Sequence, residues 1–437
     1  MKKFVFLLAL LGLSSAASAQ WALQPLTFSA PDQFPYRFSI SNPSTAWTIG
    51  FGYDSPGLNQ VARTIDGGQN WSLVTVPGIG PDDVISGINA LDANTAWISV
   101  LDYNGGGRLL QTTNGGTTWT RKTTTEFAQT DPNFVHFFNA NEGVAMGDLG
   151  ESAPLNRLDI YTTTDGGTTW QAATAPAPIS NENGVILAPS VIGNAIWFAT
   201  DEGRVYRSSD KGRTWNVAAL PPSGELFDLA FRDLQNGLAM TVDNANVFHL
   251  HRTTDGGVTW PEIQYTGDLK TAGIDNVPGT NTYIAVGAGD GRSLPGSAYS
   301  TDEGATWISL DNLRYHTGVA AFSPTTIWSG AVNSSTGAMG VYKLTTTVLP
   351  AKSGATTLAM QAFPNPSANG LINVQVPQAG DYNVRVTDAL GREVVRRRFT
   401  DVVSRQLALD LSQQPAGLYT IQVNSKAGVS HLKIQIQ

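Results

Sequence analysis

Residues 253–260 have the sequence TTDGGVTW, in which two hydroxyl residues precede an acid, two glycines and, three positions after the second glycine, a tryptophan. We call this octapeptide a box, and the chain contains six of them. The other copies are TIDGGQNW (64–71), TTNGGTTW (112–119), TTDGGTTW (163–170), SSDKGRTW (208–215) and STDEGATW (300–307). Successive box tryptophans are 48, 51, 45, 45 and 47 residues apart. A period of this length predicts a repeat architecture in which each unit packs against its neighbours.

Differences among the boxes indicate what each position requires. The fifth place is always glycine, which fits a turn with positive φ. The third place is Asp in five copies and Asn in one, and both offer a side-chain oxygen to turn amides. The final tryptophan brings a large apolar area that can hold the turn against a neighbouring unit. We therefore predict structural, non-catalytic roles for Asp66, Asn114, Asp165, Asp210, Asp255 and Asp302, and for Trp71, Trp119, Trp170, Trp215, Trp260 and Trp307.

A second repeated feature is a turn followed by a short apolar strand, as in NPSTAWTIG (42–50) and SPTTIWSGA (323–331). Seven such stretches occur but only six boxes, and the strand GVYKL (340–344) has no box behind it. Each box tryptophan begins the outer strand of its unit, but the seventh unit has no box to supply that strand. Trp21 is therefore expected to begin the outer strand of the seventh unit, beside residues 340–344. The fold class is therefore predicted as all-β, with a seven-bladed β-propeller over residues 20–347 closed by an N-terminal strand.

The remainder of the chain divides into a leader, a linker and a second domain. Residues 1–19 combine two lysines, an apolar run and a small-residue end, which predicts a secretory signal peptide. No other apolar run approaches the length of a membrane span, so no membrane-spanning segment is expected. Residues 348–357 are expected to be a linker. In residues 358–437, period-two patterns such as YNVRVTD and LYTIQVN predict a small antiparallel sandwich.

Charge and composition exclude some classes of partner. Residues 20–349 contain 16 Lys and Arg against 30 Asp and Glu, a net charge of −14, which argues against nucleic acid. His249 and His251 share a strand face but have no third ligand nearby, and the glycine-rich 287–291 begins no helix. We therefore predict no metal and no cofactor. The chain has no cysteine, so its exported domains must hold together by packing alone.

The box resembles the Asp-box, or BNR, repeat of sialidases, sortilin-type receptors, xyloglucan-cleaving enzymes and photosystem II assembly-factor-like propellers. Its even spacing, with a box in nearly every unit, is most similar to the assembly-factor and sortilin-like group. The resemblance implies a propeller in which the box is a fold element. It also implies that function lies on the opposite face.

The C-terminal segment resembles the type A sorting domain of the type IX secretion system. The matching residues are Phe363–Pro366, Gly370, Asp388–Arg392, Leu409–Leu411 and Pro415–Tyr419. The resemblance implies an immunoglobulin-like sandwich and an interaction with the type IX secretion machinery through residues 358–437. It also implies passage through the periplasm to a secreted or outer-membrane surface-attached state.

Loops opposite the boxes carry the candidate ligand-binding residues, which are Arg204, Arg292, Asp148, Asp201, Asp290, Tyr103 and Tyr315. We expect a surface-displayed or secreted, non-catalytic propeller that binds an extracellular protein or a glycan on this face. The alternative is a glycoside hydrolase that uses a carboxylate pair from the same loops. A third possibility is an accessory factor in envelope assembly, and fold analogy cannot decide among the three.

Overall fold

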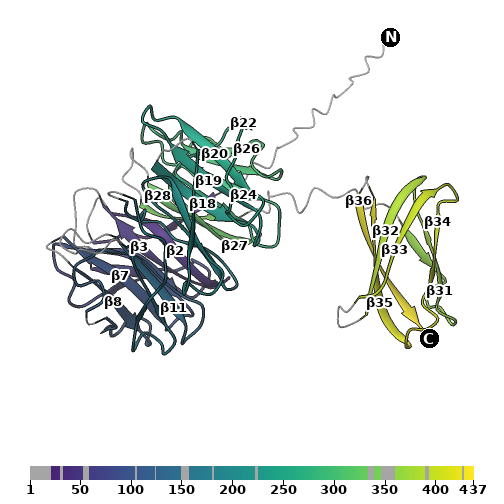
Figure 1. The fold of residues 1–437 in the computed structure, drawn as a ribbon, viewed down its shortest axis with the longest axis horizontal. Helices are drawn as coiled ribbons and strands as arrows, with labels where there is room; N and C mark the ends of the chain where they lie inside the picture. The colour runs from purple at the N-terminus through teal and green to yellow at the C-terminus, as the bar shows by residue number, and fades with distance from the viewer. Residues whose placement is uncertain are drawn as a thin grey trace, which may run out of the picture. The chain divides into compact units, whose positions relative to one another are not determined.

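A computed structural model describes residues 21–29, 33–52, 59–103, 106–123, 125–148, 157–179, 182–221, 225–332, 339–345, 360–388, 393–425 and 428–437. The predicted signal peptide and the predicted linker lie outside the described residues. Contacts divide the chain into two units, residues 1–349 and 350–437, and both are built of strands (Figure 1). In the described parts of the chain, no helix is long and apolar enough to span a membrane.

The described residues of the first unit form seven sheets, mainly of antiparallel pairs, which we number in chain order. Sheet 1 consists of β2 (Phe34–Asn42), β3 (Thr45–Phe51), β4 (Gln60–Thr64) and β5 (Ser72–Thr75). Sheet 2 consists of β6 (Asp83–Ala90), β7 (Ala96–Asp102), β8 (Gly107–Thr112) and β9 (Thr120–Arg121). Sheet 3 consists of β10 (Pro132–Phe137), β11 (Gly143–Gly147), β12 (Asp159–Thr163) and β13 (Gln171–Ala172). Each strand pairs with its neighbour in the chain, as expected of propeller blades.

The next three sheets repeat this order. Sheet 4 consists of β14 (Ser190–Ile192), β15 (Ala195–Ala199), β16 (Arg204–Ser208) and β17 (Asn216–Ala219). Sheet 5 consists of β18 (Glu225–Phe231), β19 (Gly237–Val242), β20 (Phe248–Thr253) and β21 (Glu262–Ile263). Sheet 6 consists of β23 (Gly273–Asn276), β24 (Tyr283–Gly287), β25 (Gly296–Ser300) and β26 (Thr306–Asp311), and β22 (Thr266–Gly267) adds a short parallel pairing at its outer edge.

Sheet 7 joins strands from distant parts of the sequence. It consists of β27 (Tyr315–Ser323), β28 (Thr326–Val332), β29 (Met339–Leu344) and β1 (Trp21–Pro25). β1 pairs antiparallel with β29, with Trp21 opposite Leu344 and Pro25 opposite Gly340. The predicted placement of Trp21 beside 340–344 is therefore correct.

Apolar cores lie between successive sheets rather than within one central cluster. Sheets 6 and 7 share a core that contains Trp21, Ile284 and Leu344, whereas sheets 7 and 1 share one that contains Trp328, Ala46 and Phe28. Five further clusters join sheets 1 to 2, 2 to 3, 3 to 4, 4 to 5 and 5 to 6. Every sheet thus packs against two others, and sheet 7 packs against sheet 1.

Side chains of the first strands link the sheets by hydrogen bonds. Five of them accept a hydrogen bond from a main-chain N–H of the next sheet. The pairs are Ser39 Oγ with Ala90 (2.8 Å), Asn89 Oδ1 with Phe137 (2.9 Å), Ser190 Oγ with Phe231 (3.0 Å), Asp228 Oδ2 with Ile274 (2.9 Å) and Asp275 Oδ2 with Ala321 (2.8 Å). These bonds fix the first strands at a common depth and so shape the space between them.

Each box forms a turn between the third and fourth strands of its sheet. In the box of sheet 5, Gly257 has φ +88°, a left-handed conformation that glycine adopts without strain. Thr253 Oγ1 donates to Asp255 Oδ1 (2.8 Å) and accepts from Gly257 N (2.8 Å). Asp255 Oδ1 also accepts from the amides of Val258 and Thr259, both at 3.0 Å. The acid therefore organises the turn through its oxygens, and these bonds lower its pKa to about 2 against the opposing effect of desolvation.

Asp255→Asn is expected to leave stability nearly unchanged, whereas Asp255→Ala is expected to lower the free energy of unfolding by about 1–2 kcal/mol. The reason lies in the asparagine box, where Asn114 Oδ1 accepts from Thr118 N (2.9 Å) and Asn114 Nδ2 donates to Thr118 Oγ1 (2.8 Å). Urea denaturation of both variants measures the difference. An Asn variant as unstable as the Ala variant would mean that the negative charge itself is required.

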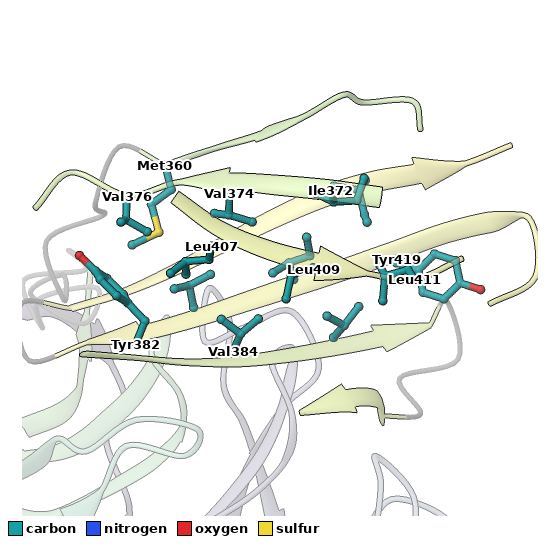
Figure 2. Packing of buried hydrophobic residues seen from close by; sticks show 14 of the residues in the cluster. Met360, Ile372, Val374, Val376, Tyr382, Val384, Leu407, Leu409, Leu411 and Tyr419 are labelled. Atoms are coloured by element: carbon teal, nitrogen blue, oxygen red, sulfur yellow. The ribbon is translucent and has the colours of Figure 1, made fainter. Parts of the chain in front are cut away.

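The second unit contains two sheets that share one core. A three-stranded sheet consists of β30 (Gln361–Phe363), β31 (Leu371–Gln375) and β34 (Gln406–Asp410). A four-stranded sheet consists of β32 (Gly380–Asp388), β33 (Glu393–Val402), β35 (Gly417–Ser425) and β36 (Gly428–Ile436). Figure 2 shows Ile372, Val374, Leu407 and Val384 in the space between the sheets, where all four are buried.

Candidate functional site

The first strands of the seven sheets surround a cavity of about 550 Å³. Each of β2, β6, β10, β14, β18, β23 and β27 contributes to its wall. The volume lies within the range of small-molecule sites, about 300–1,000 Å³. The hydrogen bonds between the sheets hold these strands in place, so the shape of the cavity depends on the packing of all seven sheets.

Arg37 of β2 lies in this wall. Its exposed fraction is only 7%, and its Nε and Nη2 have no hydrogen-bond partner. Its guanidinium carbon lies 5.0 Å from the centre of the Tyr36 ring. Burial lowers the pKa of Arg37, while Tyr36 and Asp228 oppose that shift.

Two half-buried acids, Asp228 of β18 and Asp275 of β23, also line the cavity. Burial raises the pKa of Asp228 to about 6, although the amides of Ile274 and Leu229 and the charge of Arg37 act in the other direction. Burial also raises the pKa of Asp275 to about 7, and the nearby Asp228 adds to the rise. Both acids therefore change charge near neutral pH.

None of these three residues is among the ligand-binding candidates predicted from the sequence. Arg37 lies within FPYRF (34–38) and Asp228 within ELFDLAF (225–231), so each interrupts an apolar strand. A charged residue inside such a strand is the signal that could have identified them, because buried charges need partners.

The candidate residues selected from the sequence lie where the second strand of a sheet connects to the third, or next to the connections between sheets. We call this end of the sheets the open edge and the opposite end, where the boxes lie, the box edge. The structure gathers most of the candidates into two groups at the open edge, one on sheets 3 and 4 and one on sheets 6 and 7.

Asp148, Asp201 and Arg204 form the first group. Asp148 Oδ1 accepts from Gly184 N (2.8 Å) and Asn133 Nδ2 (2.5 Å), while Asp201 Oδ1 accepts from Asn183 N (2.8 Å). Two carboxylates thus bind consecutive amides. Burial raises the pKa of Asp148 to about 7, with Asp131 and Asp201 contributing and the two hydrogen bonds opposing.

Arg204 does not have the exposure that ligand contact requires, and the expectation that it faces solvent needs correction. It is 9% exposed, and its Nη1 lies 2.9 Å from Oε2 of the fully buried Glu182. Glu182 also accepts from Thr200 Oγ1 at 2.7 Å. The pair is satisfied internally, so Arg204 stabilises the connection between sheets 3 and 4.

Asp290, Arg292 and Tyr315 form the second group. Asp290 and Arg292 are exposed, and Asp290 Oδ1 accepts from the amides of Arg292 (3.0 Å) and Ser293 (2.9 Å). Tyr315 is half-buried and lies against Gly289, where a Cβ atom would come within 2.1 Å of its ring. Tyr103 lies apart on sheet 2 and is 69% exposed.

Large exposed apolar side chains, which the sequence patterns did not predict, are also found at the open edge. Those of the first unit at this edge are Phe51, Tyr103, Ile179, Ile186, Val247, Leu294 and Leu313. At the box edge the corresponding residues are Ile65, Leu234 and Val258. Leu313 is 82% and Leu294 68% exposed, and Gly296 N donates to Arg314 O (2.7 Å), which joins their two loops.

The histidines of sheet 5 are engaged with protein groups. His249 contacts Glu262 through Nδ1 (2.9 Å) and Asp243 through Nε2 (3.2 Å). These two bonds raise its pKa. His251 is buried and hydrogen-bonded to Thr241 at 2.9 Å. Within the described ranges, no group of three or more His, Asp or Glu side chains is arranged to hold a metal ion.

Comparison with known families identifies the second unit. Residues 361–437 match the family described as the secretion system C-terminal sorting domain. The C-terminal unit is a type IX sorting domain. The chain is therefore secreted or attached to the outer-membrane surface, and the domain implies an interaction with the type IX secretion machinery.

Sequence relatives of this chain include two xyloglucanases. Xyloglucanase Xgh74A of Acetivibrio thermocellus is 26% identical over 249 residues, which cover 48% of this chain and 29% of that enzyme. A xyloglucanase of Paenibacillus sp is 26% identical over 186 residues, covering 40% of this chain and 17% of that enzyme. The chain thus spans less than a third of each relative.

Solved structures similar to this chain include two of YCF48. The structure of YCF48 bound to D1 peptide has a TM-score of 0.54 and 16% identity, covering 75% of this chain and 97% of that one. YCF48 from Cyanidioschyzon merolae has a TM-score of 0.53 and 16% identity, covering 75% and 99%. The predicted propeller resemblance is confirmed at the level of a BNR-type, propeller-like fold.

Proposed function

We propose that this chain is an exported, non-catalytic binding protein that recognises a protein or a glycan at its open edge. In this proposal residues 1–19 are a signal peptide and residues 20–347 form a seven-bladed β-propeller closed by β1. Residues 348–357 are a linker, and residues 358–437 form an immunoglobulin-like sandwich that directs type IX secretion.

The closed ring is supported by two contacts of sheet 7. β1 supplies its outer strand, and its inner strand lies against sheet 1, where Thr317 Oγ1 donates to Pro35 O (2.5 Å). A ring of this kind leaves few exposed strand edges. Binding then falls to the loops at the two ends of the sheets.

The observation that carries the proposed function is the concentration of exposed apolar side chains at the open edge. Leu294 and Leu313 lie on neighbouring loops next to Tyr315, which gives sheet 6 and sheet 7 a joint apolar surface. Contiguous exposed apolar surface on a soluble protein typically marks an interaction site. Within the described ranges, the box edge has fewer such residues, in keeping with a structural role for the boxes.

Leu294→Ser combined with Leu313→Ser is expected to weaken ligand binding about thirtyfold or more, because each substitution removes about 1 kcal/mol or more of apolar burial. The full chain is screened on a glycan array and on a peptide array, and the strongest ligand of each is titrated. The matched control is Ile65→Ser, an exposed apolar residue at the box edge. Equal binding by the parent chain, the double variant and the Ile65→Ser control would contradict the proposal.

Glycoside hydrolysis is the second candidate, and Asp148 favours it. A carboxylic acid whose pKa is about 7 is substantially protonated at neutral pH, as a general acid requires, and Asp201 binds the adjacent amide. Xyloglucan and aryl-glycosides are the substrates to test. Hydrolysis that Asp148→Asn abolishes would replace the binding proposal with the enzymatic one.

A further inference from the structure

Arg37 is a buried arginine that no acid among the described residues reaches within ion-pair distance, although Asp228 lies near enough for the two charges to affect each other's pKa. Two other arginines with low exposure have acidic partners, since Arg204 pairs with Glu182 (2.9 Å) and Arg108 with Asp83 (2.6 Å). No ion pair reaches Arg37 among the described residues, and its Nε and Nη2 are unpaired. Burying a charge without an ion-pair partner is unfavourable, so an acidic partner from outside the chain would stabilise Arg37.

We propose that the cavity binds a small ligand bearing a carboxylate, which pairs with the Nε–Nη2 edge of Arg37. These two nitrogens point their N–H bonds in parallel, the arrangement that a carboxylate accepts with both oxygens. Both atoms are shielded from solvent in the free chain, so binding includes a turn of the Arg37 side chain into the cavity whose wall it forms.

The other titratable groups of the cavity are either engaged with protein groups or neutral, so the ligand needs one negative charge, placed at Arg37. Arg232 is occupied by Asp233 (3.0 Å) and by Glu303. Burial lowers the pKa of His136 to about 4, so this side chain is neutral at physiological pH. Asp228 and Asp275 accept hydrogen bonds from main-chain amides. Tyr36 lies under the guanidinium of Arg37. Among the described residues that line the cavity, Arg37 is the one permanently charged cation without an ion-pair partner.

A carboxylate in such a cavity could come from a uronic-acid sugar or from the C-terminus of a peptide. Both carry one negative charge and two acceptor oxygens. The site lies in the cavity and does not depend on binding at the open edge, so either proposal can fail without the other.

Isothermal titration of the full chain at pH 5.5 tests the site with D-glucuronate and N-acetylglycine. The neutral matches are D-glucose and N-acetylglycinamide. At least one carboxylate is expected to bind while its neutral match does not, and Arg37→Gln is expected to weaken binding about tenfold or more. Binding of glucuronate alone assigns a sugar acid, and binding of N-acetylglycine alone assigns a peptide terminus. No binding of either, or equal binding by Arg37→Gln, overturns the proposal.

The stability of the free chain separates a ligand-binding arginine from a structural one. Arg37→Gln removes an unpaired buried charge and is expected to leave the melting temperature unchanged or raise it. Arg204→Gln is the matched control, because it leaves Glu182 buried without a partner and is expected to lower the melting temperature. If Arg37→Gln destabilises as much as Arg204→Gln, Arg37 is structural and the proposal is wrong.

Binding is also expected to weaken several-fold from pH 5.5 to pH 8. With pKa values of about 6 and about 7, Asp228 and Asp275 are largely protonated at the lower pH and ionised at the higher one. Their negative charges then compete for Arg37, while the probe carboxylate is charged throughout. Tighter binding at pH 8 would contradict the site.

Discussion

Trp21→Ala is expected to lower the free energy of unfolding by about 3–5 kcal/mol. The Trp21 side chain is 2% exposed and belongs to the core between sheets 6 and 7. Its Nε1 donates to Ser297 Oγ (2.8 Å), and its ring contacts the edge of His316 with centroids 5.0 Å apart. The substitution therefore leaves a cavity and removes one hydrogen bond of Ser297 Oγ, which still donates to Asp311 Oδ2 (2.8 Å).

Leu23→Ala is the matched control for this prediction. Leu23 lies on the same strand, β1, but is 43% exposed. Its truncation is expected to cost less than about 1 kcal/mol. Chemical denaturation of both variants, followed by tryptophan fluorescence and circular dichroism, gives the two values. Similar small losses for both would mean that β1 does not hold sheets 6 and 7 together.

Gly330→Ala is expected to destabilise the first unit by about 3 kcal/mol, through overpacking where sheet 7 meets sheet 1. A Cβ atom on Gly330 would lie 1.9 Å from Pro35 O and 2.0 Å from Thr317 Oγ1. Pro35 O is a main-chain atom of β2, so the clash is relieved only by moving the two sheets apart.

The same denaturation experiment on Gly80→Ala provides the comparison. A Cβ atom at Gly80 would meet only Asp83 Oδ2, at 3.5 Å, which is ordinary van der Waals contact. This variant is expected to unfold like the parent chain. If Gly330→Ala also unfolds like the parent, sheets 7 and 1 do not approach each other as described.

Local patterns predicted the strand pairing because they repeat. The constant glycine of the box required positive φ, and Gly257 and its counterparts have it. Counting strands against boxes placed Trp21 beside 340–344, and β1 pairs there in register with β29. Such signals are available from sequence because each depends on residues only a few positions apart and recurs six or seven times.

The cavity and the ion pairs were harder to foresee because their partners come from different repeats. Arg204 was selected as an exposed loop residue, but Glu182, which follows a long connection, buries it. Asp228 hydrogen-bonds to Ile274 in the next sheet, and Arg37 approaches the same cavity from sheet 1. Single charged residues within apolar strands have no period, so repetition could not reveal them.

The pairing of β1 with β29 is tested most directly by an engineered disulfide. The chain has no cysteine, so Ala22→Cys with Lys343→Cys introduces a single pair at directly opposed positions. Closure predicts that the purified, oxidised variant is a monomer whose tryptic digest contains the 22–343 cross-link in high yield. The control variant combines Ala22→Cys with Gln111→Cys on sheet 2, and its two thiols should remain reduced. Free thiols or only intermolecular bonds at 22 and 343 would contradict the closed ring.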